Sequence, residues 1–520
     1  MSEKWQQRWL LAIVAVALAV YASSLFAELT FDDGHTIVWH PGVQDAFSFS
    51  KIFLRDFWGN EFTAPTAVGT WRPLVTLTFW IDRHLARGAP WPFHATNLLL
   101  FAALLVMLDR FLRRWAEGTL SPTARLLTVG AFALMTIHAD VVPSATGRAE
   151  LLAMLLSIVA LHLAVHPQPK TRHFVLMGVA LLGAMASKES ALPMAVLLPI
   201  FTHRRTPRVK KDVLVVAAVS LSVLAAMIAF RASRLPFHKT GLEMQYDNVL
   251  MLRPAPQRLF GAMQVLSTYL EHSATALDLC PDYSYAAVVP TDPIRATLGV
   301  VLAISAMALL GVLLRRGARS ADALLAFGAT YVVASSVIVP ASAMLADRLF
   351  FFPSLWVLVL LAYGGDAIAR ARPNLRSFVV GAAIVAIVGQ GLLTALAARI
   401  WHDDRTLTSY AVQACPNVIR LRLLRAQVQY NNGAPDEAAW STLVASALLT
   451  QFPTPIPLEA FPPEWEELPL DKRLELFVQR LGGVGPALQR ILVLAHNALR
   501  SQNQPMADQI LAGWFQGAAP

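Results

Sequence analysis

The sequence predicts an all-α polytopic membrane protein, and its composition is the first observation that points to this fold class. Hydrophobic residues make up 56% of the 520 residues, charged residues only 15%, and the mean hydropathy is +0.50. Soluble proteins contain roughly 45–50% apolar and about 25% charged residues. This chain has too little polar surface to face water on all sides, which excludes a soluble enzyme, a disordered scaffold and a nucleic-acid-binding arm.

Apolar runs that recur along the chain are the second observation. A helix needs about 20 residues to cross 30 Å of hydrocarbon, and several runs are shorter, so their boundaries are approximate. The first run follows Lys4 and Arg8 and precedes no small-residue cleavage site, so we interpret it as a retained signal anchor. We expect about eleven spans, at Leu10–Phe26, Phe93–Leu108, Ala124–His138, Leu151–Val165, Phe174–Ala186, Ala191–Phe201, Val213–Phe230, Ile294–Leu314, Ala323–Pro340, Leu349–Tyr363 and Phe378–Ala397.

The basic residues are the third observation, because they gather in alternate loops. Cytoplasmic loops of membrane proteins carry an excess of Lys and Arg, which predicts a cytoplasmic N-terminus. The short loops of the other side carry only Arg148, Lys188 and Arg348. Topology thus explains the net charge of +9 without a nucleic-acid partner. The cytoplasmic loops would hold Arg110, Arg113, Arg114, Arg125, Lys170, Arg172, Arg204, Arg205, Arg208, Lys210, Lys211, Arg315, Arg316, Arg319, Arg370, Arg372 and Arg376.

Two domains follow from this count of spans. Residues 1–400 would form the membrane domain, with long external loops at 27–92 and 232–292, and residues 401–520 an external α-helical domain. In the first loop, Ala46–Phe57 and Pro73–Leu85 mix apolar and charged residues, as helices that lie along a membrane interface do.

The C-terminal domain contains spacings typical of a tetratricopeptide repeat. Ala426, Gly433 and Ala438 fall where two such helices pack closely around a turn, and a second stretch, Ala495–Ala507, repeats the spacing. Such arrays need about three units, so an ordinary small helical domain is the alternative. The proline-rich stretch Phe452–Pro469 is expected to be irregular.

Both cysteines, Cys280 and Cys415, are predicted to lie on the external face. They could form a disulfide in an oxidising compartment. We favour the alternative that both are unpaired and buried.

Each short external turn carries a cation beside an anion. Ionisable groups at the end of a membrane helix are costly and usually face a cavity or one another. Local ion pairs with snorkelling side chains are one interpretation. A shared pocket for a phosphate carried on a lipid is the one we favour. The pairs are Arg148 with Glu150, Lys188 with Glu189, and Asp347 with Arg348.

Adjacent carboxylates open the first external loop at Asp32 and Asp33. Such a pair can act as a general base or hold a divalent cation, although a solvated turn explains most Asp-Asp pairs. His138 and Asp140 close the third span, but no spacing completes a metal-ligand set, so the metal stays unknown and a divalent cation is the one cofactor left open. The second long loop contains Leu279–Tyr285, an aromatic and polar segment able to cover or bind a ligand.

Many short motifs, in this order, resemble the membrane half of the transmembrane and tetratricopeptide-repeat protein O-mannosyltransferases, which are C-type glycosyltransferases. The likeness covers about residues 10–436. Met135 replaces a histidine that the family often has, and the repeat array is short. The motifs are Phe31-Asp32-Asp33, Asp56-Phe57-Trp58-Gly59, Trp71-Arg72-Pro73-Leu74, Phe93-His94 with Asn97, Ile137-His138-Ala139-Asp140, Gly147-Arg148-Ala149-Glu150, Ser187-Lys188-Glu189, Asp282-Tyr283-Ser284-Tyr285, and Asp347-Arg348-Leu349 with Pro353-Ser354.

The resemblance implies a multi-span bundle, a catalytic acid in the first external loop and a polyprenyl-phosphate-linked sugar as donor. Asp32 or Asp33 would be the base that deprotonates the acceptor hydroxyl. Glu150, Glu189 and Asp347 would orient the cations that stabilise the leaving phosphate. The donor-binding residues would be His35, Arg72, His94, Asn97, His138, Arg148, Glu150, Lys188, Glu189, Tyr283, Asp347 and Arg348.

The expected function is a membrane glycosyltransferase that transfers a sugar, expected to be mannose, to a protein Ser or Thr on the extracytoplasmic face. Transfer of another sugar, a glycan or lipid acceptor, and a non-enzymatic transporter or flippase of lipid-linked sugars are the alternatives. Polar residues at one face favour chemistry over transport, because transporters bind at mid-membrane. The expected location is a bacterial inner membrane, or the endoplasmic reticulum in a eukaryote, with the C-terminal domain periplasmic in the bacterial case.

Overall fold

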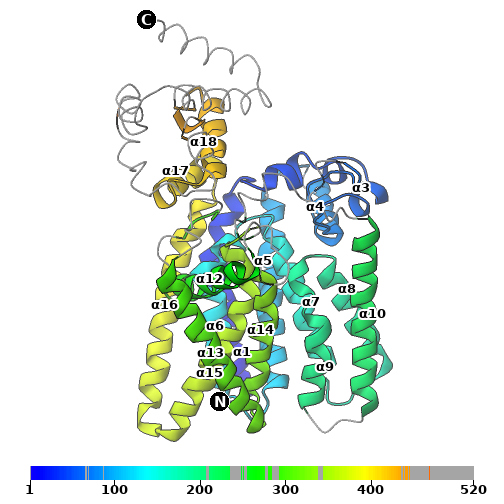
Figure 1. Cartoon of the computed structure of the whole chain (residues 1–520), viewed down its shortest axis with the longest axis vertical. Coiled ribbons are helices and arrows are strands. Elements are labelled where there is room, and N and C mark those ends of the chain that lie inside the picture. The colour runs from blue at the N-terminus through cyan, green and yellow to red at the C-terminus, as the bar shows by residue number, and fades with distance from the viewer. Residues whose placement is uncertain are drawn as a thin grey trace, which may run out of the picture.

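A computed structural model gives the arrangement of most of the chain (Figure 1). It describes residues 2–64, 67, 69–85, 87–205, 210–234, 248, 250, 254–275, 279–283, 292–335, 337, 343–434, 437–438, 440–442, 444–445 and 468.

The predicted fold class is confirmed, since the elements of the described residues are helices and each expected span corresponds to one of them. Within the part of the chain that the structure describes, six segments are long and apolar enough to cross a membrane: Glu3–Phe26, Trp91–Trp115, Lys210–Arg234, Pro293–Arg315, Asp347–Ala371 and Pro373–Ile400. The helices of the spans are α1 (Glu3–Tyr21), α5 (Trp91–Trp115), α6 (Pro122–Leu134), α7 (Arg148–Ala164), α8 (Thr171–Met185), α9 (Met194–Arg205), α10 (Lys210–Arg234), α13 (Pro293–Arg315), α14 (Ser320–Ala334), α15 (Phe351–Ala371) and α16 (Arg376–Ile400).

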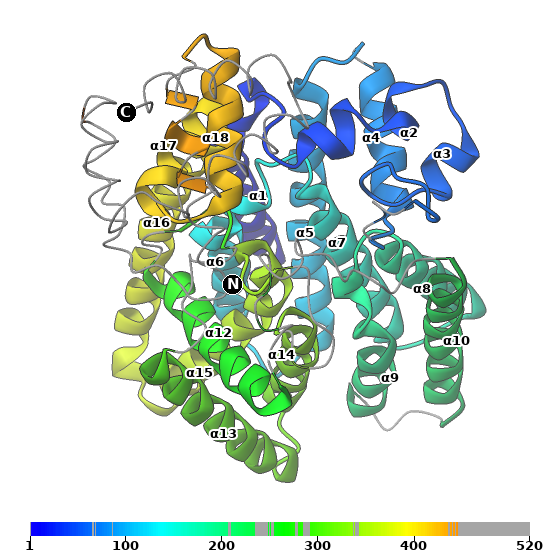
Figure 2. The same ribbon diagram turned by 45° about the horizontal axis from the view of Figure 1, so that its top comes forward.

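The two ends of the bundle carry different parts of the chain. The N-terminus and the turn between α15 and α16 lie at one end (Figure 1). The first long loop and the helices after α16 lie at the other end, which we call the loop end (Figure 1 and Figure 2). At the N-terminal end, Asp322 pairs with Arg204 and Arg319, and Asp109 pairs with Arg125 and Arg113.

The first long loop forms a small helical layer at the loop end. It contains the short helices α2 (Pro41–Gln44) and α3 (Phe49–Phe53) and the longer α4 (Pro73–Leu85). The predicted helix Pro73–Leu85 is confirmed, and Ala46–Phe57 shortens to α3. The shortening has a local cause: Ser48 caps α3 by accepting the Lys51 N–H, and Leu54 leaves the helical region.

The second long loop contains a helix that the apolar pattern does not predict, α12 (Ala255–Thr275). Its charged and polar residues lower its hydropathy, but one face is buried, with Ala262, Val265 and Tyr269 inside. The helix also packs against α13 at Gly299, where a Cβ would come within 1.8 Å of the Met263 carbonyl oxygen. The absence of a side chain at Gly299 is what lets the two helices touch.

After α16 the chain forms a helical hairpin, α17 (Asp404–Ala414) and α18 (Ile419–Asn431). Ala426 packs against Ala438, and Gly433 between them has a φ of +75°. The assignment of this segment as a tetratricopeptide-like repeat stays a prediction. Residues 495–507 and 452–467, named above as a second unit and an irregular stretch, lie outside the described residues.

The cysteine prediction is wrong. Cys280 and Cys415 form a disulfide that joins the second long loop to the end of α17. Their separation of 135 residues hides this proximity in the sequence. Folding brings them together because α12 and α17 both dock at the loop end, where one apolar cluster contains both cysteines.

Gly299 provides a test of the α12–α13 contact. We expect Gly299→Ala to lower the melting temperature of the detergent-solubilised protein, since the new methyl group must displace the Met263 carbonyl. Gly311→Ala, on the same helix with open space around it, is the control. It should be neutral or slightly stabilising because Ala favours a helix by about 1 kcal/mol over Gly. Equal melting temperatures for the two variants would contradict the close contact.

Candidate functional site

The ion pairs of the three short turns run between turns instead of within them. Residues one or two positions apart on a helix point to different sides, so each charged group finds its partner on another element. Arg148 pairs with Asp82 of α4, at 2.6 Å, and Lys188 pairs with Glu150 of α7, at 2.5 Å. These contacts connect α4, α7 and the turn after α8 at the loop end.

Arg148 is fully buried and satisfied by protein groups. Its guanidinium donates to the Asn97 side chain at 2.9 Å and the Phe93 carbonyl at 2.7 Å, and it lies over the Phe79 ring at 4.7 Å. Asp82 supplies the opposite charge. With no exposed surface, this side chain holds α4, α5 and α7 together instead of lining a cavity.

Glu189 gathers two cations beside Lys188. It accepts hydrogen bonds from Arg72 at 3.3 Å and from Arg231 of α10 at 3.1 Å. Burial would raise the pKa of Glu189, but the two guanidiniums outweigh it and lower the pKa to about 2. The group is only partly buried, with side-chain exposures of 14% for Arg72 and 20% for Arg231, so both cations can reach a ligand.

Asp33 is an internal carboxylate. Its oxygens accept the N–H groups of Thr30 at 3.1 Å and Thr146 at 2.9 Å, so it joins the first loop to the turn before Arg148. Burial raises the pKa of Asp33 to about 7, against the lowering effect of those two bonds. Its side chain is inaccessible, since the residue is 0% exposed.

Asp32 points in a different direction and lies between two guanidiniums. Its Oδ1 accepts a hydrogen bond from Arg420 of α18 at 2.8 Å, and its Oδ2 lies 4.0 Å from Arg348. The Asp32 side chain is 15% exposed. Of the two adjacent acids, it is the one that can reach an external group.

Arg348 links Asp32 to a second acid, Asp140, whose Oδ2 lies 3.4 Å from the Arg348 guanidinium and 3.3 Å from its backbone nitrogen. Burial raises the pKa of Asp140 to about 7, although the guanidinium opposes this rise. Asp347, which immediately precedes Arg348 in the sequence, accepts hydrogen bonds from His272 of α12 at 2.9 Å and from the Tyr283 hydroxyl at 2.8 Å.

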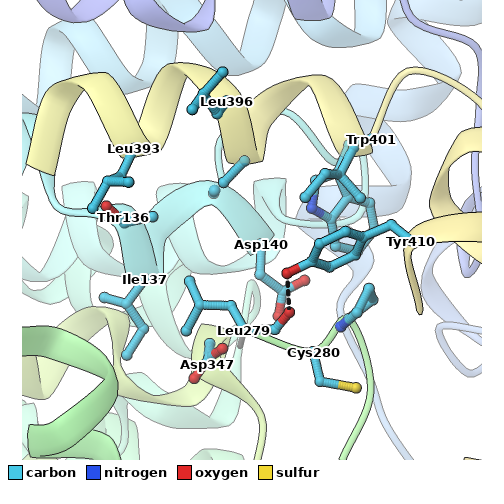
Figure 3. Close-up of a pocket in the computed structure, with 14 residues that line it drawn as sticks. Thr136, Ile137, Asp140, Leu279, Cys280, Asp347, Leu393, Leu396, Trp401 and Tyr410 are labelled. Carbon is cyan, nitrogen blue, oxygen red and sulfur yellow. Dashed lines mark hydrogen bonds between the residues drawn. The ribbon is translucent and has the colours of Figure 1, made fainter. Parts of the chain in front are cut away.

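A cavity of about 200 Å³ adjoins this cluster (Figure 3). Asp140 and Asp347 supply its charged wall, and Trp401 and Tyr410 supply an aromatic wall. An apolar wall comes from the loop-end turns of α16, at Leu393, Leu396, Ala397 and Ile400, and residues 136, 137, 139 and 279–281 complete the lining. The cavity therefore joins a membrane helix to carboxylates, which suits an amphipathic ligand.

The structure thus brings together Asp32, Asp347, Arg348 and Tyr283, and separately Arg72, Glu150, Lys188 and Glu189. Of the other predicted residues, Asn97 and His138 are buried and bonded to protein groups. His138 contacts the Phe132 carbonyl and the Ser354 hydroxyl. His94 is buried against the Pro143 carbonyl, and His35 is exposed and lies against Trp39. Among the residues that the structure describes, no group of three or more His, Cys, Asp or Glu is placed to hold a metal ion.

Five residues of these networks were missed by the sequence reasoning: Asp82, Arg231, His272, Asp282 and Arg420. Arg231 lies just past an apolar run and Asp82 lies in a predicted amphipathic helix, so both resemble ordinary interface charges. Asp282 was noted only as part of a motif, and here it accepts from Arg420 at 3.4 Å. Arg420 carries no signal at all, because it is one of several arginines in a polar helix.

A bundle of apolar helices with interlinked carboxylates and guanidiniums at one end defines a multi-pass membrane protein with a polar centre at the membrane surface. The chain is similar to protein O-mannosyl-transferases. It is 24% identical over 449 residues to protein O-mannosyl-transferase F38B6.6 of Caenorhabditis elegans, covering 83% of this chain and 61% of the relative. It is 25% identical over 490 residues to protein O-mannosyl-transferase TMTC4 of Homo sapiens, covering 81% and 63%.

A shorter stretch of 148 residues is 31% identical to protein O-mannosyl-transferase TMTC2 of Mus musculus and covers 28% of this chain and 17% of the relative. No family model and no solved structure matches the chain. The resemblance that the motifs predict is confirmed by these relatives. The chain spans about three fifths of the length of the first two.

Asp33 makes the folding stability depend on pH. Its pKa of about 7 in the folded protein lies above the usual 3.8, so its contribution to stability is complete below about pH 4 and is lost as the pH rises through about 7. Asn does not titrate. We therefore expect the melting temperature of the native protein, measured relative to that of Asp33→Asn, to fall between about pH 4 and about pH 7 and to level off above this range. A difference independent of pH would contradict the burial of this carboxyl group.

Proposed function

We propose that this protein is a membrane glycosyltransferase that moves mannose from a polyprenyl-phosphate donor to a Ser or Thr hydroxyl of a protein on the extracytoplasmic face. The observation that carries the proposal is the accessible Asp32, which lies between two guanidiniums. One of them, Arg348, also pairs with Asp140 in the wall of a cavity that joins carboxylates to a membrane helix. The named activity of the relatives supports the class of reaction.

Asp32 is the general base in this proposal. A base must come within hydrogen-bonding reach of the hydroxyl it deprotonates, and Asp33 is enclosed with both of its oxygens bonded to backbone N–H groups. Oδ1 of Asp32 is bound by Arg420, which leaves Oδ2 to accept the proton. Asp33 instead fixes the turn that presents Asp32.

The leaving phosphate requires cations that are already in place. Arg348, Arg72, Lys188 and Arg231 are held at the loop end by acids, so their positions cost no reorganisation during the reaction. Arg148 does not contact the phosphate in this scheme. Its buried ion pair with Asp82 holds in place the helices that carry the other groups.

The cavity of Figure 3 is proposed to take the head of the donor, with the polyprenyl chain leaving along α16. Leu392 and Leu396 are exposed on this helix, which provides an apolar surface for the chain. Aromatic rings and carboxylates on the facing walls suit a sugar ring and its hydroxyls. Separate arms of the assay below would detect another sugar or a non-protein acceptor.

The external assignment of the loop end is also part of the proposal. Disulfides persist in oxidising compartments such as the periplasm and the endoplasmic reticulum lumen, and Cys280–Cys415 lies at this end. The opposite end carries the arginine-rich turns, as expected for a cytoplasmic face.

The proposal is tested by Asp32→Asn in the purified protein reconstituted with labelled mannosyl polyprenyl phosphate. We expect the release of polyprenyl phosphate and the labelling of Ser and Thr in an acceptor protein mixture to fall at least about 100-fold, as for loss of a general base. Asp45→Asn is the control, since Asp45 is an exposed acid of the same loop paired with Lys51.

The outcomes are distinct. Full activity in Asp32→Asn would remove the base assignment. A native protein that moves the labelled lipid between leaflets without cleaving it would favour a flippase. Label recovered on lipid or glycan in place of protein would change the acceptor.

A further inference from the structure

We infer that Arg420 of the C-terminal domain is a positioning residue for Asp32 and that the α17–α18 hairpin completes the catalytic centre. The inference rests on the proposed function. It assigns to the beginning of the domain after α16 a role at the reacting acid.

The Arg420 guanidinium joins two external loops through one side chain. One nitrogen donates to Asp32 in the first loop at 2.8 Å and the other to Asp282 in the second at 3.4 Å. Two carboxylates brought together would repel each other, and a planar guanidinium between them neutralises this repulsion while it fixes their separation. A lysine ammonium has no such fork, so the geometry calls for arginine.

The backbone before Asp32 needs support from the same hairpin. Phe31 has a φ of +54°, in the left-handed region that is strained for a bulky residue. Such conformations persist where the surroundings fix them, and they concentrate at active sites. Here Asp404 of α17 accepts the Phe31 N–H at 2.8 Å, and the Arg420 guanidinium lies over the Phe31 ring at 4.9 Å. Asp404 and Arg420 both belong to the hairpin, and they add to the support that Asp33 gives this turn from within the loop.

The hairpin is attached to the membrane domain at several further points. The Glu28 N–H donates to the His402 carbonyl at 2.8 Å, and the Tyr410 hydroxyl donates to the Leu279 carbonyl at 2.8 Å (Figure 3). The Cys280–Cys415 disulfide lies beside the second contact. Trp401 and Tyr410 also form a wall of the cavity. Contacts with the first long loop and with the second long loop therefore both fix the hairpin that carries Arg420.

Arg420 sets the direction of the base. Without it, Asp32 keeps only the 4.0 Å contact with Arg348 as an ion pair, which is too long to fix a rotamer. The carboxylate would then spend most of its time away from the productive orientation. This loss affects the chemical step, whereas the donor cations Arg72, Lys188 and Arg231 are held by other residues and stay in place.

The test uses the full-length protein and the mannosyl polyprenyl phosphate assay. We expect Arg420→Ala to lower kcat about 10- to 100-fold, the size of a hydrogen bond between charged groups, with the KM for the donor changed less than about twofold. Arg420→Lys should recover part of the loss. Added guanidinium ion at millimolar concentration should partly restore Arg420→Ala, but not Asp32→Asn. Arg405→Ala, an exposed arginine on the neighbouring helix α17, is the control and should match the native protein.

Several results would overturn the inference. They are an unchanged kcat in Arg420→Ala, an equal loss in Arg405→Ala, or a loss that comes with a lower melting temperature and is restored neither by guanidinium nor by lysine. Inactivity of the native protein with this donor would instead count against the proposed function itself. The two failures are therefore distinguishable.

Discussion

The cost of removing charges from water governs the loop end of this protein. Paired charges survive burial only when each has an opposite charge and its remaining hydrogen-bonding groups are satisfied. Arg148 meets that demand with Asp82, Asn97 and the Phe93 carbonyl, and it thereby fixes three helices relative to one another. Lys188 pairs with Glu150 and Arg72 pairs with Glu189 for the same reason, and these ion pairs connect elements that are distant in sequence.

These pairs divide the polar centre into a rigid part and an accessible part. Fully enclosed groups such as Asp33 and Arg148 define where the turns lie. Partly exposed groups such as Asp32 and Arg348 are carried on those turns and face the outside. In the proposed reaction, the donor phosphate and the acceptor hydroxyl meet charges whose orientation is already set, which is the arrangement that electrostatic catalysis needs.

The sequence predicts the helices well because hydrophobic spacing is a local property. The apolar runs locate the spanning helices, and Pro73–Leu85 coincides with α4 to the residue. The apolar runs do not predict α12, because the apolar residues of this helix alternate with polar ones. Its buried face becomes evident only from its packing in the folded structure.

Partners of charged side chains are a non-local property and could not be predicted. The sequence suggests that Arg148 and Glu150 share a pocket, yet their partners, Asp82 and Lys188, come from other elements. The cysteines illustrate the same limit, since 135 residues separate a pair that folding joins. Arg420 is the extreme case: nothing in a polar helix distinguishes an arginine that reaches an acid from one that faces water.

The contact between Asp32 and Arg420 spans 388 positions along the chain. A growing polypeptide exposes the first loop long before α18 has been made. During biogenesis Asp32 therefore has no contact with Arg420 while the remaining helices insert one after another. In the proposed mechanism the base is therefore aligned only after α18 has been made, so a chain that stalls within the membrane would be inactive.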